Sequence, residues 1–290
     1  SLGGEFRTSA AAGSEPRLIL SVYQPLDKRF NYFVSGRAGF VSYIFPQVSN
    51  DNEVEQLFRF NRSFIDLEAG RIFNQNTELT IGLHRADGDT ETLVGQMPTG
   101  DTRFDEGGYR VSLLHDSLNS VDFPRSGYHG RLTWRANRES LGADLDYDQV
   151  AMSLSGAGTW GRHTVYARTI LETTVDENAP ENALFRRGGL FELSGYLNRQ
   201  LAGQHFGLLE VVYYRQLGSI ALLQLYAGFS LETGNVWNNR DDIALDNLVY
   251  AGSAFLGADT LFGPLYLAYG INDSNTSSIY LYLGRRWSPN

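Results

Sequence analysis

The feature that most constrains this chain is a regular alternation of apolar residues with small or polar ones. In residues 223–232 every odd position is Leu, Ala or Phe, whereas the even positions are Gln, Tyr, Gly, Ser and Glu. Successive side chains of a β-strand point to opposite faces, so a segment of this kind has one apolar wall and one small-or-polar wall. The alternation predicts an all-β fold.

Fourteen segments carry a strand signal of this type. They are residues 4–12, 17–23, 31–44, 56–72, 78–84, 109–116, 130–138, 149–160, 164–173, 208–217, 222–236, 248–260, 265–271 and 279–287. Turn residues separate them, and they follow one another along the whole chain. We therefore expect about fourteen strands in an antiparallel, up-and-down β-barrel.

The connections between these segments alternate in length. The long ones are residues 13–16, 45–55, 85–102, 139–146, 176–206, 237–247 and 272–278. The short ones are residues 24–29, 73–77, 117–127, 161–163, 218–219 and 261–264. Long loops on one rim and tight turns on the other are the layout of outer-membrane barrels, whose short turns are periplasmic. An even strand count would then place both termini in the periplasm. A soluble β-sandwich or a lipocalin-like barrel would show the same alternation, and this alternative is not excluded. Such folds, however, rarely reach fourteen strands in one chain.

The composition is compatible with a transmembrane barrel. No run of eighteen apolar residues exists, which excludes a membrane-spanning helix. A mean hydropathy of −0.27 is ordinary for a barrel, because its strands alternate lipid-facing and lumen-facing residues. The 13% aromatic residues suit interfacial girdles, and the absence of cysteine suits an oxidising periplasm. A net charge of −9 argues against nucleic acid as a partner.

One segment, residues 176–206, interrupts the regular array, and we call it the long loop. It contains glycines, arginines and aromatic residues, and it does not alternate cleanly. A long loop held between regular strands is more often a working part than a connector. We therefore expect it to carry function.

A turn in the middle of the chain resembles one in the Omp85 superfamily of outer-membrane β-barrels. In that family an Asp-x-x-x-x-x-x-Phe-Pro-x-x-Gly pattern precedes a β-hairpin. Here the pattern is formed by Asp116, Phe123, Pro124 and Gly127.

Two later segments resemble the same family. Residues 230–237, SLETGNVW, are similar to the strand that follows the family's sixth extracellular loop. Residues 281–287, LYLGRRW, are similar to its closing strand, with Gly284 followed by an aromatic residue at Trp287. Five strands follow the long loop, as they do in the family.

Within the long loop, Leu193, Ser194, Gly195 and Tyr196 stand where the family has a Val/Ile-Arg-Gly-Phe/Tyr tip. Ser194 replaces the usual arginine. The Leu-Ser-Gly-Tyr form is similar to the branch fused to patatin-like phospholipase domains, the type Vd autotransporters, and so are residues 2–7 and 23–27, which match that branch at its third and fourth strands.

The resemblance implies a single barrel domain over residues 1–290 that secretes or displays a covalently linked N-terminal passenger. Family members have sixteen strands, so we expect this chain to be a fragment that lacks the first two. A POTRA domain and a patatin-like lipase are expected upstream, with no enzyme in this chain.

In the family the arginine at the loop tip pairs with a strand carboxylate inside the lumen. The alternation makes Glu232 face inward here, but Ser194 cannot be its cationic partner. A buried charge needs a partner, so another arginine is expected to replace the missing one. The candidates are Arg186, Arg187, Arg199, Arg131 and Arg135. A solvated loop above a wet lumen is the alternative.

Other sites receive little support. The chain has no G-x-S-x-G, and residues 153–158 are interpreted as a glycine-bearing strand. A barrel phospholipase, suggested only by His115 and Asp116, and a passive porin or ligand-uptake barrel remain alternatives. The acidic stretches 87–89 and 241–242 are interpreted as solvated turns, so no cofactor and no metal is expected.

The expected partners follow from the resemblance and from the rim charges. They are outer-membrane lipid and lipopolysaccharide, near Arg85 and Arg103, the translocated polypeptide, and the barrel assembly machinery. A homodimer is also possible on the sequence alone. The expected location is the outer membrane of a Gram-negative bacterium.

Overall fold

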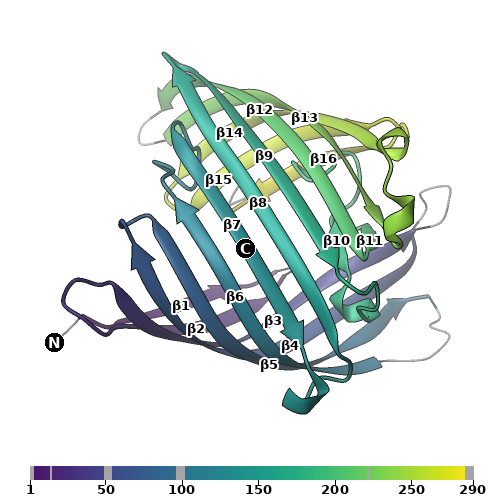
Figure 1. Ribbon diagram of the computed structural model, residues 1–290. Coiled ribbons are helices and arrows are strands. Elements are labelled where there is room, and N and C mark those ends of the chain that lie inside the picture. The colour runs from purple at the N-terminus through teal and green to yellow at the C-terminus, as the bar shows by residue number, and fades with distance from the viewer. Residues whose placement is uncertain (1–2, 14, 49–53, 96–101, 221–222, 285–290) are drawn as a thin grey trace. The chain divides into compact units, whose positions relative to one another are not determined.

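The computed structural model describes residues 3–13, 15–48, 54–95, 102–220 and 223–284. Fourteen strands form one sheet in which hydrogen-bonded neighbours follow one another in chain order, and two short strands form a second sheet (Figure 1). Every strand pair whose register is described runs antiparallel. The expected all-β, antiparallel, up-and-down fold is confirmed, and so is the strand number of the main sheet.

The strands of the main sheet are β1 (Glu5–Ala11), β2 (Arg17–Pro25), β3 (Tyr32–Val48), β4 (Val54–Phe73), β5 (Thr77–Val94), β6 (Thr102–Asp116), β7 (Gly127–Asn137), β8 (Tyr147–Trp160), β9 (His163–Thr174), β12 (His205–Ile220), β13 (Leu223–Trp237), β14 (Val249–Thr260), β15 (Gly263–Asn272) and β16 (Ser277–Leu283). The second sheet pairs β10 (Phe185–Arg187) with β11 (Leu201–Gly203) inside the long loop. In the described parts of the connections lie four short 3-10 turns: η1 (Glu139–Leu141), η2 (Glu181–Ala183), η3 (Arg240–Asp242) and η4 (Leu245–Asn247).

Several expected strand boundaries are wrong, and the end of β5 differs most. Residues 85–94 were expected in a loop, with Asp87 and Asp89 in a solvated turn, but they continue β5 to Val94. The register pairs Asp89 with Asn61 of β4, and the Asn61 amide donates to the Asp89 carboxylate at 3.0 Å. Polar residues on both walls hide the alternation in this part of the strand. Trp287 of the expected closing strand lies outside the described residues.

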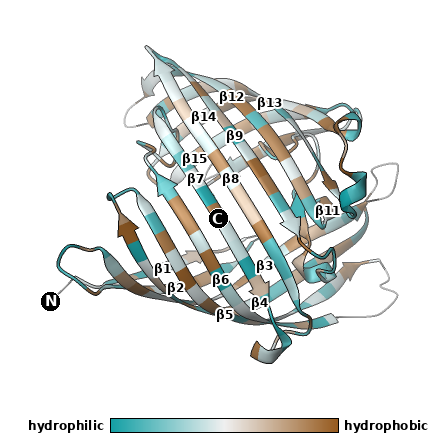
Figure 2. Ribbon diagram, in the orientation of Figure 1, coloured by the Kyte–Doolittle hydropathy of each residue, from teal (hydrophilic) through white to brown (hydrophobic). Residues whose placement is uncertain are grey.

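The sheet exposes its aliphatic face and buries the other, which is the reverse of the arrangement in a soluble protein. In β15 the aliphatic residues Leu265, Leu267 and Ile271 are exposed, whereas Tyr266 and Ala268 are buried. Bands of apolar and polar residues alternate along the strands in Figure 2. A soluble sandwich buries its aliphatic wall, so this arrangement favours a wall that is solvated by lipid.

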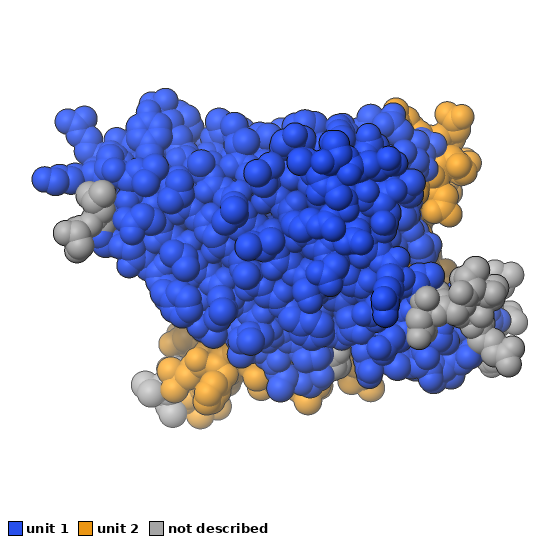
Figure 3. All heavy atoms as spheres, turned by 90° about the horizontal axis from the view of Figure 1, so that it is seen from below, with its two compact units in different colours: residues 1–114, 132–150, 174–184 blue, residues 115–131, 151–173, 185–290 orange. Residues whose placement is uncertain are grey.

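The described chain divides into two compact units (Figure 3). Unit 1 comprises residues 1–114, 132–150 and 174–184, and unit 2 comprises residues 115–131, 151–173 and 185–290. No helix among the described residues has the length and apolar character needed to cross a membrane.

In unit 1 the face opposite the aliphatic wall is charged. Arg62 pairs with Glu106 at 2.7 Å, and Arg37 pairs with Asp66 at 2.8 Å. Arg110 lies 3.5 Å from Glu68, which extends the pairing across three strands. This polar wall includes both signs of charge, as a water-filled lumen would tolerate.

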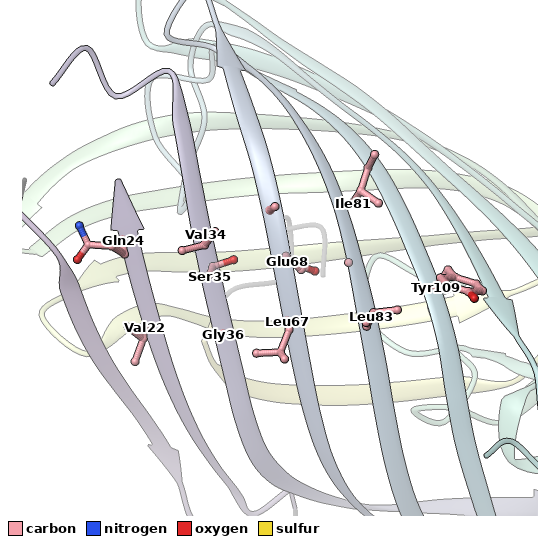
Figure 4. Close-up of a pocket in the computed structure, with 12 residues that line it drawn as sticks. Val22, Gln24, Val34, Ser35, Gly36, Leu67, Glu68, Ile81, Leu83 and Tyr109 are labelled. Carbon is pink, nitrogen blue, oxygen red and sulfur yellow. The ribbon is translucent and has the colours of Figure 1, made fainter. Parts of the chain in front are cut away.

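The aliphatic wall of unit 1 is hollowed by a shallow groove of about 720 Å³ (Figure 4). Its lining includes the small residues Gly36, Ala69 and Gly82 and several larger apolar side chains. These are Val22, Val34, Leu67, Ile81, Leu83 and Tyr109. The lining also includes Gln24, Ser35 and Glu68, so the groove is a dip in a mostly apolar surface.

Candidate functional site

The buried face of unit 2 is filled by aromatic side chains from several strands and from two inserted segments. The cluster contains Phe123, Tyr166, Leu190, Phe191, Val212, Tyr214, Tyr226, Phe255, Tyr266 and Ala268. Phe191 of the long loop meets Phe255 and Tyr266 edge to face, with ring centroids 5.2 and 5.7 Å apart. Such pairs favour one defined arrangement, so the loop is packed against the sheet and not solvated.

The backbone of the long loop is held in an uncommon conformation around its tip. Phe191 and Leu193 have φ of 66° and 70°, and Gly195 has φ of 99°. The side chains of Leu190, Phe191, Leu193 and Ser194 have no exposed surface. A positive φ is unfavourable for a bulky residue, so packing and hydrogen bonds must maintain this conformation.

Ser194 docks the loop tip on Glu232 of β13. Its backbone N–H donates to Oε2 of Glu232 at 2.7 Å, and its hydroxyl donates to Oε1 at 2.7 Å. Ser230 donates a further hydrogen bond to Oε1 at 2.6 Å. Glu232 is only 4% exposed, so these donors replace the water that the carboxylate has lost.

The arginine expected beside Glu232 is absent from its described surroundings, which corrects the expectation. Arg187 instead pairs with Glu172 of β9 and lies over the ring of Phe206, 5.1 Å from its centroid. Burial lowers the pKa of Arg187, but the carboxylates of Glu172 and Glu192 outweigh this and hold it above its ordinary value.

The other candidate arginines occupy different places. Arg186 lies beside Arg187 in β10 and is paired in register with Ala202. Arg199 lies near the end of the long loop with φ of 59°. Arg131 is in the part of β7 that belongs to unit 2, and Arg135 is in the part that belongs to unit 1.

A second anchor, which the sequence interpretation missed, lies at Arg168 of β9. Its Nε donates to Glu210 of β12 at 2.7 Å, and its Nη2 donates to the carbonyl of Phe191 at 2.8 Å. Glu192 of the loop lies 3.9 Å from the same guanidinium. The only signal in the sequence was the position of Arg168 and Glu210 on the small-or-polar face of their strands.

The loop tip also contacts the end of the sheet at β15 and β16. The Gly195 N–H donates to the Tyr280 hydroxyl at 2.9 Å, and that hydroxyl donates to the Tyr196 carbonyl at 3.0 Å. Ser278 donates to the Gly195 carbonyl at 3.1 Å. A Cβ at position 195 would lie 2.8 Å from backbone atoms of Asn272 and Thr276, so glycine is required here.

The Asp116–Gly127 turn inserts a second segment into the aromatic cluster. The Phe123 ring stacks on Tyr226 with centroids 4.1 Å apart. Tyr214 donates its hydroxyl proton to the Pro124 carbonyl. Arg125 donates to the Gln216 side chain at 3.0 Å and to the Gly161 carbonyl at 2.9 Å.

No group of three or more acidic, histidine or cysteine side chains within the described residues could hold a metal ion. Residues 241–242 fall in η3, and residues 153–158 lie within β8, as expected of a glycine-bearing strand. The long loop is packed and hydrogen-bonded against the strands of unit 2.

Similarity to solved structures identifies the fold. No family model matches the sequence, and no curated protein matches it either. The chain superposes on BamA from Haemophilus ducreyi lacking POTRA domains 1–3 with a TM-score of 0.69, 12% identity and coverage of 93% of this chain and 61% of that one. The chain has the BamA barrel fold.

CdiB structures give similar values. For CdiB from Acinetobacter baumannii the TM-score is 0.65 at 12% identity, covering 91% of this chain and 48% of that chain. For CdiB from Escherichia coli the TM-score is 0.63 at 13% identity, covering 93% and 51%. The chain thus spans about half to three fifths of the BamA and CdiB chains that it matches.

Proposed function

We propose that this chain is an outer-membrane barrel of the Omp85 type that moves a polypeptide across or into the membrane, and that the long loop is a tethered plug in its lumen. Three features support this proposal. The fold is that of BamA and CdiB, the aliphatic wall faces outward, and the opposite wall of unit 1 is charged.

The observation that carries the proposal is the docking of Ser194 on Glu232. A solvated loop would leave this carboxylate to water, whereas here two donors of one loop residue occupy both of its oxygens. Together with Arg168 and Tyr280, these contacts attach the loop to β9, β13 and β16. A segment held in this way occludes the lumen until its hydrogen bonds break.

The finer assignment is the patatin branch of type V secretion. It is supported by the Leu-Ser-Gly-Tyr tip, in which a neutral residue replaces the arginine of the wider family. On this proposal the cargo is a covalently linked N-terminal passenger with a patatin-like lipase, both termini are periplasmic, and this chain itself performs no catalysis. An intact coding sequence with POTRA and G-x-S-x-G segments upstream would test it.

Planar-bilayer recording tests the plug. The purified chain is expected to give a small and fluctuating conductance, which becomes large and steady when residues 189–199 are replaced by a short Gly-Ser linker. Replacement of residues 240–246, in another long loop, is the matched control and should leave the conductance unchanged. A large and steady conductance in the unaltered chain would favour a passive porin instead.

A further inference from the structure

The aliphatic wall of unit 2 contains one patch of a different character, near the short turn between β8 and β9. Trp160 and His163 have nearly parallel rings, with centroids 6.2 Å apart and planes at 12°. His163 in turn lies against Tyr213, whose ring contacts Phe229. Trp160 is 57% exposed and Phe229 is 47% exposed, so this row of rings lies on the outer surface.

Two arginines accompany the aromatic row. Arg215 is two residues beyond Tyr213 on the same face of β12, and its register partners are His163 of β9 and Ala227 of β13. Arg162 lies in the adjacent turn. Both are exposed, and neither makes an ion pair or a side-chain hydrogen bond with any other described residue. Ala227 is small and leaves room for the Arg215 guanidinium.

The acidic residues of the neighbouring strands point the other way. Glu210 of β12 and Glu232 of β13 are buried on the opposite face. The outward positions of the three strands around Arg215 are apolar or neutral apart from His163. The patch therefore has two positive charges and no anion from its own wall.

The aromatic row also contains hydrogen-bond donors that have no acceptor among the described residues. His163 Nδ1 and the Tyr213 hydroxyl are 2.6 Å apart and form one hydrogen bond, in which either group can be the donor. If the hydroxyl donates to Nδ1, the neutral ring keeps a free Nε2–H. If Nδ1–H donates to the hydroxyl oxygen, the hydroxyl proton is free instead. The Trp160 indole N–H has no acceptor among the described residues. Each of these groups calls for an acceptor.

A phosphodiester matches this patch. It carries only acceptor oxygens and one negative charge, and a guanidinium binds it through two parallel hydrogen bonds. Aromatic side chains of barrels gather at the membrane–water interface, where lipid headgroups lie. A zwitterionic headgroup would bring an ammonium group toward two arginines, which disfavours it.

We propose that Trp160, His163, Tyr213 and Arg215, assisted by Arg162, form a binding site for the headgroup of an anionic phospholipid such as phosphatidylglycerol. The site lies at the rim of short turns. This inference rests on the proposed location of the chain in a membrane.

Native mass spectrometry of the full chain, released from mixed phosphatidylglycerol and phosphatidylcholine nanodiscs, tests the site. Retention of a bound phosphatidylglycerol is expected to fall about tenfold in R215Q, since the loss of one charge-assisted hydrogen bond has about this effect. R17Q, which removes an exposed arginine from β2, is the matched control and should retain the lipid. R215K keeps the positive charge but lacks the planar guanidinium, so its lipid retention should lie between that of R215Q and that of the control.

Several results would overturn the inference. One is equal retention of the two lipids by the unaltered chain, and another is an equal loss in R215Q and R17Q. If inorganic phosphate alone competes as well as phosphatidylglycerol, the site takes free phosphate and not a lipid. If R215Q does not fold, W160F and R162Q must each weaken retention. Failure of the chain to float with vesicles would instead refute the proposed membrane function.

Discussion

Glu210 and Glu232 lie directly opposite each other on β12 and β13, and both side chains are buried, with 0% and 4% of their surface exposed. Their partners differ in kind. Glu210 binds the guanidinium of Arg168, whereas Glu232 binds neutral donors of Ser194 and Ser230. The sheet thus supplies the cation for Glu210, whereas Glu232 receives two donors from Ser194 of the loop and one from Ser230 of the sheet.

Glu232→Ala should release the loop tip. The variant removes both acceptors of Ser194, and each hydrogen bond to a charged group contributes about 1.5–3 kcal/mol. We expect a lower midpoint of thermal unfolding and a larger channel conductance. Ser194→Ala, which removes the hydroxyl but keeps the backbone N–H donor, should give a smaller change of the same sign. An unchanged conductance and stability in Glu232→Ala would contradict the tethered plug.

Arg168→Met alone should lower the free energy of unfolding more than Arg168→Met combined with Glu210→Gln. Removal of the arginine leaves Glu210 buried without its cation, which costs about 3–5 kcal/mol. A neutral glutamine at position 210 removes most of that penalty. Denaturant unfolding of the four proteins of this cycle gives the coupling energy, and additive effects would show that the pair is not a unit.

Gly195→Ala should undock the tip without altering any charge. Position 195 has φ of 99°, and a methyl group there would lie 2.8 Å from Asn272 N and Thr276 O. Limited proteolysis should cut the long loop faster in this variant. Gly158→Ala is the control, because a Cβ there meets nothing within 4 Å and φ is not positive. Equal cleavage rates would mean that the tip can shift to accept the methyl group.

Phe123→Ala should loosen the turn that is inserted into unit 2. It removes a ring stacked on Tyr226, and loss of a buried Phe costs about 3–5 kcal/mol. The unfolding midpoint should fall clearly, whereas Val121→Ala, at a 42% exposed position of the same turn, should change it little. Comparable effects of the two substitutions would argue against an inserted Phe123.

Acid should open the turn between β2 and β3. The Asp27 carboxylate accepts hydrogen bonds from the backbone N–H groups of Tyr32 and Asn31, at 3.0 and 2.8 Å. The Tyr32 bond is the main reason that the pKa of Asp27 is below its ordinary value. Because the folded pKa is lowered, the stabilisation is present above the unfolded pKa of about 3.9 and disappears as pH falls through the folded pKa.

Amide hydrogen exchange measures this opening. Protection of the Tyr32 N–H should decrease at low pH, after correction for intrinsic exchange. Asp27→Asn keeps a side-chain acceptor but removes the titration, so its protection should not depend on pH in this range. If the protection of the Tyr32 N–H in the unaltered chain did not depend on pH, the role of the carboxylate would be refuted.

The sequence predicted the sheet better than the site. Strand order and direction follow from alternation because the exposed wall is almost continuously aliphatic, as in β13 and β15. Alternation fails where both walls are polar, as beyond Arg85 in β5, and it cannot detect strands of three residues such as β10 and β11.

The site could be predicted only in outline. The parity of Glu232 in its strand indicates which wall it occupies, and the structure buries it there. The identity of its partner depends on register and on loop conformation, which a period of two does not encode. The interpretation required a cation, whereas the N–H and hydroxyl of one serine satisfy the same carboxylate.

The serine at position 194 has a kinetic consequence. A guanidinium that leaves a buried carboxylate and re-enters must exchange a tightly held hydration shell in each direction, whereas a hydroxyl exchanges far less water. The dehydration barrier to motion of the tip is therefore lower than it would be with an arginine at position 194. The positive φ values at Phe191 and Leu193 act in the same direction, because undocking would let this strained backbone relax.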